Sequence, residues 1–510
     1  MIYRLHIHDW RVIAHYLGIL IMLVAVAMVF CFVVALALGE YKTAVDFLLS
    51  IGISATVGAV LILFRYEHGS LDWRQSLIIT GLCWVILSLF GALPLSMSGQ
   101  YANYLDAMFD TVSAFTTTGM SLALDTDHMA LSLALWRAIM HLIGGIGVVV
   151  IALALGIFGT GAAAASLYRA EARSGQVMPE IRQTSRFILR LAAVIVVVGT
   201  IACMIPLFLN GFSVRSALVN GFIVTASAFS TGGMSTHSMG LMYYHSWPLE
   251  VIALVLAMLG CINFVLYGDL WRGRTKNFFK DIEVRTLVVW VTALVVLIAL
   301  AIKGSYFEDL GAMLRRTLFE TLSGAFNLGF STMYTGQILY GMGSGALFVI
   351  ILSMIICGSS SSASGGIKAF RVGIVARSIA QTIREVLAPD RARPRTFYYQ
   401  QGKKLVTPEL VSSSMIILLL YVVTYVVGAI VGVACGYNAL PAIFDSVSAA
   451  SNTGLSLGVA SAGMPRVLEV TFMLEMWLGR LEFVAIFAMI VELFAFVVPS
   501  KRMRWRTKKK

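Results

Sequence analysis

A twelve-residue pattern occurs four times in this 510-residue chain, and each copy lies between two long apolar segments. Aligned without gaps, all four copies carry serine at the fourth place, glycine at the tenth and serine at the twelfth. Because chance rarely matches three columns in four copies, we interpret the chain as repeats of one unit: apolar span, short polar re-entry, apolar span. Copies 1 to 4 occupy residues 110–121, 224–235, 320–331 and 445–456.

The apolar segments indicate an integral membrane protein. Apolar residues make up 59% of the chain and charged residues 13%, far from the composition of soluble domains. Runs of about 20 apolar residues recur, which is the length a helix needs to cross the hydrocarbon core of a bilayer. The six cysteines are scattered singly, so they predict neither a disulfide framework nor a metal site.

The net charge of +12 is interpreted as a topology signal. Most Lys and Arg residues lie in six clusters that fall on one side when the spans are threaded alternately, as the positive-inside rule requires. Both termini are therefore expected in the cytoplasm, and nucleic acid is not expected as a partner. The basic tail anchors this topology or touches anionic lipid or a partner. The clusters lie at residues 4–11, 65–74, 169–190, 272–285, 368–404 and 501–510.

Threading the spans predicts an all-α membrane protein with four membrane-pore-membrane repeats around one pore and an N-terminal two-helix hairpin. Two spans in the hairpin and eight in the repeats give ten. The last return span is expected over residues 467–498. The expected units are the hairpin at 1–72, repeats 1 to 3 at 73–170, 171–284 and 285–383, a cytoplasmic linker at 384–407, and repeat 4 with the basic tail at 408–510.

The repeated stretch suits a cation path. Non-helical backbone at membrane depth is tolerated where it is buried in protein or lines a watery cavity. Four glycine-containing strands around an axis would present rings of backbone carbonyls that replace the hydration shell of an ion. The short helices before them would aim their negative C-terminal ends at the axis. The alternative is that glycine and serine only pack spans together.

These residues resemble the TrkH, KtrB and HKT superfamily of potassium-uptake pore subunits, most closely its bacterial TrkH branch. The resemblance rests on TTTGMS, FSTGGMS, NLGFS, SNTGLS, HLIGGIG, LGCINFVLY, GSSSSASGGIK and LGRLE. It implies that the place-10 glycines line the ion path. Glycine rather than serine at residue 119 favours potassium over sodium, while copy 3 departs from the usual threonine-rich pattern. The expected filter residues are Thr117, Thr118, Gly119, Thr231, Gly232, Gly233, Asn327, Leu328, Gly329, Asn452, Thr453 and Gly454.

A serine- and glycine-rich stretch interrupts the return span of repeat 3. Residues of this kind break a helix, and a loop beneath the filter would obstruct the path. The resemblance implies an intramembrane gating loop over residues 358–366, with Lys368 at its cytoplasmic side; an ordinary flexible helix end is the alternative. The expected gating residues are Gly358, Ser359, Ser360, Ser361, Ser362, Gly365, Gly366, Lys368 and Arg480.

Arg480 lies in an otherwise apolar run, where a charge needs an internal partner or a wet cavity. The resemblance places it below the filter as an electrostatic barrier. An ion pair with Glu475 or Glu482 is disfavoured by spacings of five and two, and a partner on another helix stays open.

Three histidines in the chain show no metal-ligand spacing. We expect His128, His141 and His237 to be structural, and outer acidic residues to attract cations or to be solvated: Asp106, Asp110, Asp125, Asp127, Glu320 and Asp445.

The sequence thus predicts potassium uptake across the bacterial cytoplasmic (inner) membrane by a multi-pass protein. Alternatives are a sodium-permeable relative and a non-transporting structural subunit. No enzyme activity or cofactor is expected, since HExxH and nucleotide-binding motifs are absent from the sequence. The resemblance implies a homodimer and a cytoplasmic nucleotide-binding ring of TrkA type as partners, besides the lipid bilayer and the transported K⁺.

Overall fold

The computed structural model describes residues 7–63, 72–147, 150, 151, 153, 181–302, 310–387, 389 and 395–497, and these are mostly helical. The first four helices form the N-terminal hairpin and the outgoing span of repeat 1. In the hairpin, Gly18 and Gly58 face one another's backbone, which lets the two helices approach closely. These helices are α1 (Ile7–Leu38), α2 (Tyr41–Leu63), α3 (Trp73–Gly91) and the short α4 (Leu93–Met97).

Four short helices carry the first places of the four copies. Each is buried toward its C-terminal end, and each ends at place 6 of its copy, immediately before the polar stretch. They are α5 (Tyr104–Phe115), α10 (Val214–Phe229), α15 (Leu310–Ala325) and α19 (Ala439–Ala450).

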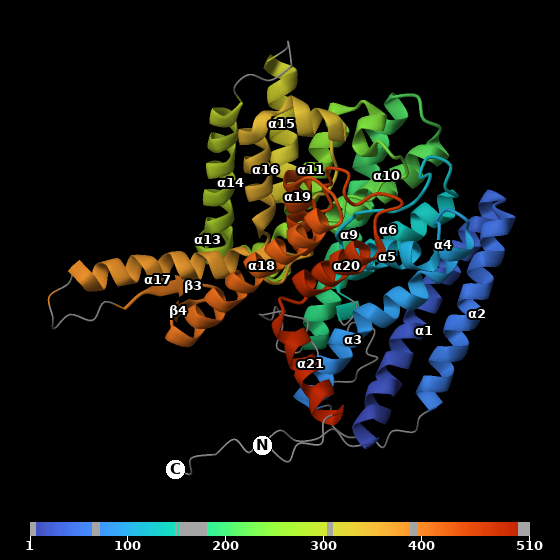
Figure 1. Ribbon diagram of the computed structural model, residues 1–510, viewed down its shortest axis with the longest axis horizontal. Helices are drawn as coiled ribbons and strands as arrows, with labels where there is room; N and C mark the ends of the chain where they lie inside the picture. The colour runs from blue at the N-terminus through green and yellow to red at the C-terminus, as the bar shows by residue number, and fades with distance from the viewer. Residues whose placement is uncertain are drawn as a thin grey trace.

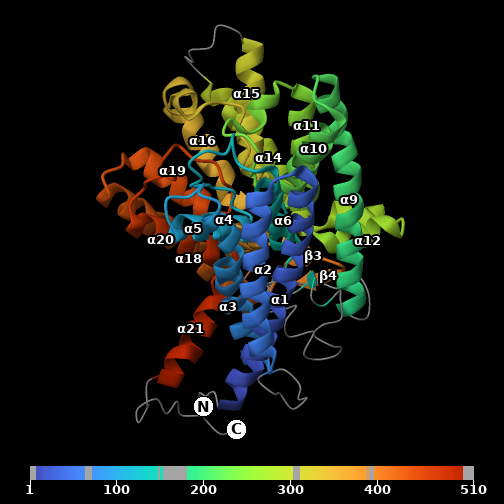
Figure 2. The same ribbon diagram turned by 90° about the vertical axis from the view of Figure 1, so that its right-hand side faces the viewer.

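The remaining helices lie around these four (Figure 1). The start of α1 and the end of α21 lie at the same end of the molecule in both views (Figures 1 and 2). The surrounding helices are α6 (Leu131–Ile146), α9 (Ile181–Leu209), α11 (Trp247–Cys261), α12 (Phe264–Trp271), α13 (Thr275–Lys280), α14 (Ile282–Ala301), α16 (Gly343–Ile355), α17 (Ala369–Leu387), α18 (Pro408–Ala434), α20 (Arg466–Arg480) and α21 (Val484–Val497), with one-turn helices at Gly240–Tyr244 and Gln337–Gly341.

Six helices within the described residues are long and apolar enough to cross a membrane: α1, α2, α3 with α4, α9, α14 and α18. A seventh span results if α11 and α12, bent by 93° at their junction, count together. Several of these helices leave large apolar side chains exposed, such as Val289 at 70% and Leu419 at 63%. Contiguous apolar faces of this kind fit a lipid environment and would be unfavourable in water.

The return helices of repeats 3 and 4 are interrupted. In repeat 3, α16 ends at Ile355, and the expected break follows as a loop closed by the parallel pair β1 (Ile356–Cys357) and β2 (Ile367–Lys368). The return span of repeat 4, expected over residues 467–498, consists of two helices. The chain breaks between α20 and α21, where Glu482 and Phe483 adopt positive φ angles of 52° and 65°. In the sequence, the break falls where Arg480 and Glu482 interrupt the apolar run.

The expected linker between repeats 3 and 4 contains structure of its own. Helix α17 projects from the side of the body beside a hairpin of β3 (Phe397–Tyr399) and β4 (Lys403–Leu405) (Figure 1). A small apolar cluster with Ile282, Ile374 and Tyr398 packs α14, α17 and the hairpin together. The basic tail and most of the 154–180 connection lie outside the described residues.

Candidate functional site

Each of the four short helices ends in the same hydrogen-bonded cap. The place-9 N–H donates to the place-4 carbonyl and the place-8 N–H to the place-5 carbonyl, as in a Schellman motif. The place-8 residue is left-handed in every copy, with φ angles between 48° and 62°. Asparagine tolerates this conformation, but a β-branched threonine is strained in it. The place-8 residues are Thr117, Thr231, Asn327 and Asn452.

The four place-10 glycines form a closed cycle of contacts. Each also has positive φ, from 65° to 94°. A Cβ atom on any of them would fall under 3.0 Å from the place-9 carbonyl oxygen of the following copy, and the copy that follows copy 4 is copy 1. Because the cycle closes in chain order, the four polar stretches surround a common centre. The contacts are Gly119 to Gly232, Gly233 to Leu328, Gly329 to Thr453 and Gly454 to Thr118.

This ring lies between an open cavity and the loop of residues 358–366. On the place-12 side, all four ring glycines and all four place-12 serines line a cavity of about 370 Å³. On the place-8 side, Thr117 Oγ1 lies 3.5 Å from the carbonyl oxygen of Ala363 in the loop. A Cβ on Gly365 would meet the Asn452 side chain. An ion crossing the ring would therefore leave the cavity and meet the loop.

None of the place-4 serines that define the repeat is among the residues lining the cavity, and three of the four support the ring backbone. Ser227 Oγ and Ser323 Oγ donate to place-11 carbonyls at 2.7 and 2.6 Å, and Ser448 Oγ accepts from the N–H of Gly454 at 3.0 Å. Ser113 Oγ is buried without a hydrogen-bond partner among the described residues.

Carboxylates at place 1 brace the exit of the ring segment. Asp445 accepts hydrogen bonds from Ser456 Oγ at 2.6 Å and from three following N–H groups. Glu320 likewise accepts from Ser331 Oγ at 2.8 Å and from the N–H of Thr332. Asp110 instead pairs with Arg137, with Nε 2.8 Å from the carboxylate. All three carboxylates are buried, so the interpretation that they are solvated charges is wrong for them.

The expected side-chain ligands of copies 3 and 4 cross-link neighbouring segments. Asn327 Nδ2 donates to the carbonyl of Ser451 at 2.8 Å. Asn452 Nδ2 donates to Thr118 Oγ1 at 3.0 Å and to the carbonyl of Met476 at 2.9 Å. These amides hold copy 3 to copy 4 and copy 4 to copy 1.

The loop over residues 358–366 is fixed by backbone groups that a helix break leaves free. Its N–H groups at Ser359 and Ala363 donate to the carbonyls of Cys261 and Gly260 at 2.8 and 2.9 Å. These carbonyls belong to the last turn of α11, which has no intrahelical partners for them. Glu283 on α14 completes the attachment, since Oε1 accepts from the N–H and the hydroxyl of Ser360 at 3.0 and 2.6 Å.

Arg480 joins the ring, the loop and α6. Its Nη1 donates to Thr117 Oγ1 at 3.1 Å and to the carbonyl of Ala363, while Nη2 donates to the carbonyl of Gly144 at 2.6 Å. The guanidinium carbon lies 5.6 Å from the centroid of the Trp84 ring, close enough for a cation–π interaction. The guanidinium therefore lies where the loop meets the ring.

The two glutamates near Arg480 in sequence have other partners. Glu482 binds Arg371 of α17, and Glu475 accepts from Ser446 Oγ at 2.9 Å.

The expected gating residue Lys368 is bound to the loop itself. Its Nζ donates to the carbonyl of Ser364, and the lysine is buried at 5% exposure.

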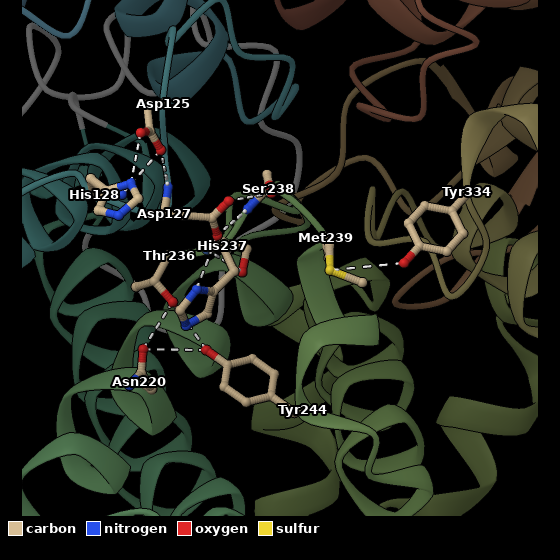
Figure 3. A network of polar contacts seen from close by, with 11 residues as sticks. Asp125, Asp127, His128, Asn220, Thr236, His237, Ser238, Met239, Tyr244 and Tyr334 are labelled. Carbon is tan, nitrogen blue, oxygen red and sulfur yellow. Dashed lines mark hydrogen bonds and ion pairs between the residues drawn. The ribbon is translucent and has the colours of Figure 1, made fainter.

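A polar network joins the segments that follow copies 1 and 2 at the rim of the cavity (Figure 3). Asp127 accepts from the N–H of Ser238 at 3.1 Å and lies 3.2 Å from His237 Nδ1. The hydrogen bonds from Ser238 hold the pKa of Asp127 below its ordinary value. Burial lowers the pKa of His237, against the opposing effect of Asp127.

Comparison with known proteins gives this arrangement a family. The family model TrkH, described as cation transport protein, matches residues 44–503. The chain belongs to the TrkH family.

Members of the TrkH family resemble this chain over nearly its full length. An uncharacterized cation transporter of Methanocaldococcus jannaschii is 27% identical over 96% of this chain and 97% of its own. The Trk system potassium uptake protein TrkH of Halomonas elongata is 27% identical over 94% and 98%. The crystal structure of the potassium transporter TrkH from Vibrio parahaemolyticus has a TM-score of 0.79 at 24% identity and covers 95% of this chain and 99% of that one.

The structure brings all twelve expected TrkH filter residues and the expected loop together, with Arg480 between them. Sequence reasoning missed three contributors: Glu283, the helix break at Cys261 and Asn263, and His141. Asn263 was detectable, because a polar residue inside an apolar span that caps the following helix marks a break. His141 had a subtler signal, which is that copy 2 alone has glycine at place 9.

Proposed function

We propose that this TrkH family member carries K⁺ into the cell across the bacterial cytoplasmic membrane. The observation that supports this most strongly is the closed cycle in which each ring glycine abuts the place-9 carbonyl of the next copy. Backbone carbonyls around one axis can exchange for the hydration shell of a cation. The four helix C-termini at place 6 add negative potential at the ring. The inward membrane potential supplies about 2.3 kcal/mol per charge for each 100 mV.

We also propose how the pore is built. Four membrane-pore-membrane repeats and the hairpin give ten spans, with both termini in the cytoplasm, in keeping with the basic clusters. Residues 358–366 act as an intramembrane gate, and Arg480 places a positive charge where the gate meets the filter. Two such chains form a homodimer that works with a cytoplasmic nucleotide-binding ring of TrkA type.

Potassium is proposed over sodium for two reasons. Relatives with near-complete coverage are named as Trk potassium uptake proteins. Residue 119 is glycine, where a Cβ atom would fall under 3.0 Å from the Gly232 carbonyl oxygen. A serine at residue 119 would therefore displace the carbonyl that it meets and alter the ring.

Growth of a bacterium that lacks its own potassium uptake tests the proposal, with a TrkA-type partner co-expressed. The wild-type chain should restore growth at low potassium, and ⁸⁶Rb⁺ should enter faster than ²²Na⁺. Gly119→Ser should reduce the Rb⁺ to Na⁺ ratio at least about tenfold at equal membrane expression. Failure of the expressed wild-type chain to restore growth, or a wild-type preference for sodium, contradicts potassium uptake.

A further inference from the structure

The joints between neighbouring ring segments are not built alike. Copies 3 and 4 are joined by Asn327, and copies 4 and 1 by Asn452, through the amide hydrogen bonds described above. Between copies 2 and 3, the place-9 side chain Leu328 is fully buried in an apolar cluster. Three copies thus have a place-9 side chain that fills the space behind the ring. The place-9 residues are Thr118, Gly232, Leu328 and Thr453.

The joint between copies 1 and 2 has no place-9 side chain, because residue 232 is glycine. The imidazole of His141, on α6, occupies that space. A Cβ atom on Gly232 would fall under 3.0 Å from His141 Nδ1 and Cε1. On its other side, the carbonyl oxygen of Gly232 is the group that Gly119 abuts. Gly232 is therefore held between the imidazole and the first ring segment.

Helix α6 is placed to bridge these two copies. Gly144 faces the carbonyl of Phe115, the last helical residue of copy 1, and Gly145 faces Ser230 of copy 2. His141 precedes Gly145 by four residues, so both lie on one helix face. That face is turned toward the second ring segment.

At the next joint, the sizes of the return-helix residue and of the place-9 residue are reversed. Gly260 of α11 faces the carbonyl of Phe229 as Gly144 faces that of Phe115, which aligns the two helices. The position three residues earlier is His141 in α6 and Ala257 in α11. Ala257 packs in the same apolar cluster as Leu328. A large helix residue thus meets glycine at one joint, and a small helix residue meets leucine at the next.

Hydrogen bonding does not explain the position of the His141 imidazole. His141 is fully buried, and neither ring nitrogen has a hydrogen-bond partner among the described residues. Leaving buried polar groups unpaired carries a free-energy penalty, so its position needs another explanation. The close fit to Gly232 supplies one, since tightly packed interiors transmit changes of even one methylene.

We infer that His141 is a specificity-determining positioning residue: it replaces the missing place-9 side chain of copy 2 and holds the Gly232 carbonyl against Gly119. The inference rests on the proposed function, because it concerns which cation the ring prefers. Removal of the imidazole would leave a void behind one of four segments, and that segment would relax away from the ring. Selectivity would then decline while insertion and folding of the chain persist.

The test is a double-mutant cycle in the full-length chain, reconstituted in liposomes with uptake of ⁸⁶Rb⁺ and ²²Na⁺ as the readout. His141→Ala should lower the Rb⁺ to Na⁺ ratio about tenfold, and His141→Gln, which keeps most of the volume, should lower it less. Gly232→Ala should abolish uptake, because its methyl group overlaps the imidazole. Adding His141→Ala to Gly232→Ala should restore uptake, since the methyl group then has room.

Thermal unfolding of the same purified variants separates lost folding from lost selectivity. The double variant should unfold at a higher temperature than Gly232→Ala alone. The inference is overturned if His141→Ala keeps the wild-type ratio, whatever that ratio is, or if the double variant recovers neither uptake nor stability. A wild-type chain that prefers sodium contradicts the proposed function instead, so the two failures are distinguishable.

Discussion

At the scale of single residues, carboxylates within the protein shape the outer end of the ring. Asp445 is fully buried, yet three backbone N–H groups and one hydroxyl donate to its two oxygens. Hydrogen bonds to a charged acceptor are about twice as strong as neutral ones. The pairing of place 1 with place 12 accounts for the serine at the end of the pattern in copies 3 and 4.

Replacing Asp445 by asparagine should therefore destabilise the exit of copy 4. The amide NH₂ would face backbone donors, which leaves buried groups unpaired and costs about 2–4 kcal/mol. Ser456→Ala removes one donor only and should cost about 1 kcal/mol. Thermal unfolding in detergent compares the two variants. Equal losses for both would show that the carboxylate does not brace the segment.

A second prediction concerns pH at the rim of the cavity. The pKa of His237 is lowered from 6.5, so the folded chain binds this proton less readily than the unfolded chain. Stability should then fall as pH drops below about 6.5. The lowered pKa of Asp127 acts in the same direction, but only below its ordinary value of 3.8.

Acidification from pH 7.5 to 5.5 should lower the unfolding temperature of the wild-type chain more than that of His237→Asn. The difference should correspond to less than about 1 kcal/mol, because the partner carboxylate is partly exposed. Asp127→Asn should keep a dependence on pH in this range, since His237 is still present. Parallel pH curves for wild type and His237→Asn would contradict the assignment.

The site residues that the sequence could predict were those that recur in the four copies. The twelve ring residues were predictable because the same columns recur in four copies, and glycine at place 10 has a backbone reason. The place-1 carboxylates were misinterpreted, since a single sequence does not show whether Asp445 faces water or turns inward to meet N–H groups. His141 was read as structural because its partner Gly232 is remote in sequence.

At the scale of elements, the loop of residues 358–366 depends on helices from other repeats. Its serine-rich sequence predicted the break after α16, and that prediction is confirmed at Ile355. Its attachment was not predictable, because the acceptors are orphan carbonyls that appear only when α11 bends away from α12. Glu283 adds a carboxylate that accepts from Ser360 and from Asn263 Nδ2 at 3.0 Å.

Loosening this attachment should favour an open loop. Glu283→Ala removes both oxygens, whereas Glu283→Gln keeps one acceptor for Ser360. We expect uptake in the absence of a cytoplasmic partner to rise about two- to fivefold for alanine, which corresponds to roughly 0.4–1 kcal/mol on the closed state, and less for glutamine. Initial ⁸⁶Rb⁺ uptake into liposomes measures this. Unchanged uptake with intact folding would mean that Glu283 does not hold the loop closed.

At the scale of the whole molecule, the turn of the N-terminal hairpin caps helix α6 of repeat 1. Helix α6 begins at Leu131 after Ala130, which has no side chain able to cap it. Glu40, in the turn between α1 and α2, supplies the cap: Oε1 accepts from the N–H of Leu131 at 2.8 Å, and Oε2 from that of Ser132 at 3.1 Å. A carboxylate at a helix N-terminus is stabilised by the free N–H groups and the helix dipole.

This contact makes the hairpin more than an appended pair of spans. The sequence predicted its two helices correctly because each is a continuous apolar run, but nothing in the sequence links residue 40 to residue 131. The same helix α6 carries His141 and Gly144 toward the ring. A change at the hairpin turn therefore acts on the element that packs against copies 1 and 2.

Glu40→Ala should cost about 1–2 kcal/mol, the usual effect of losing an N-terminal cap, while Glu40→Gln should cost less because one acceptor oxygen remains. Thermal unfolding measures the cost. Lys42→Ala is the matched control, since this exposed neighbour donates to the carbonyl of Ser98 at 3.3 Å, which is not part of α6. Because the cap is lost ten residues before His141, the Rb⁺ to Na⁺ ratio should change by less than about twofold. A larger change in this ratio from Glu40→Ala than from His141→Ala would show that the start of α6, and not the His141 imidazole, determines the cation preference of the ring.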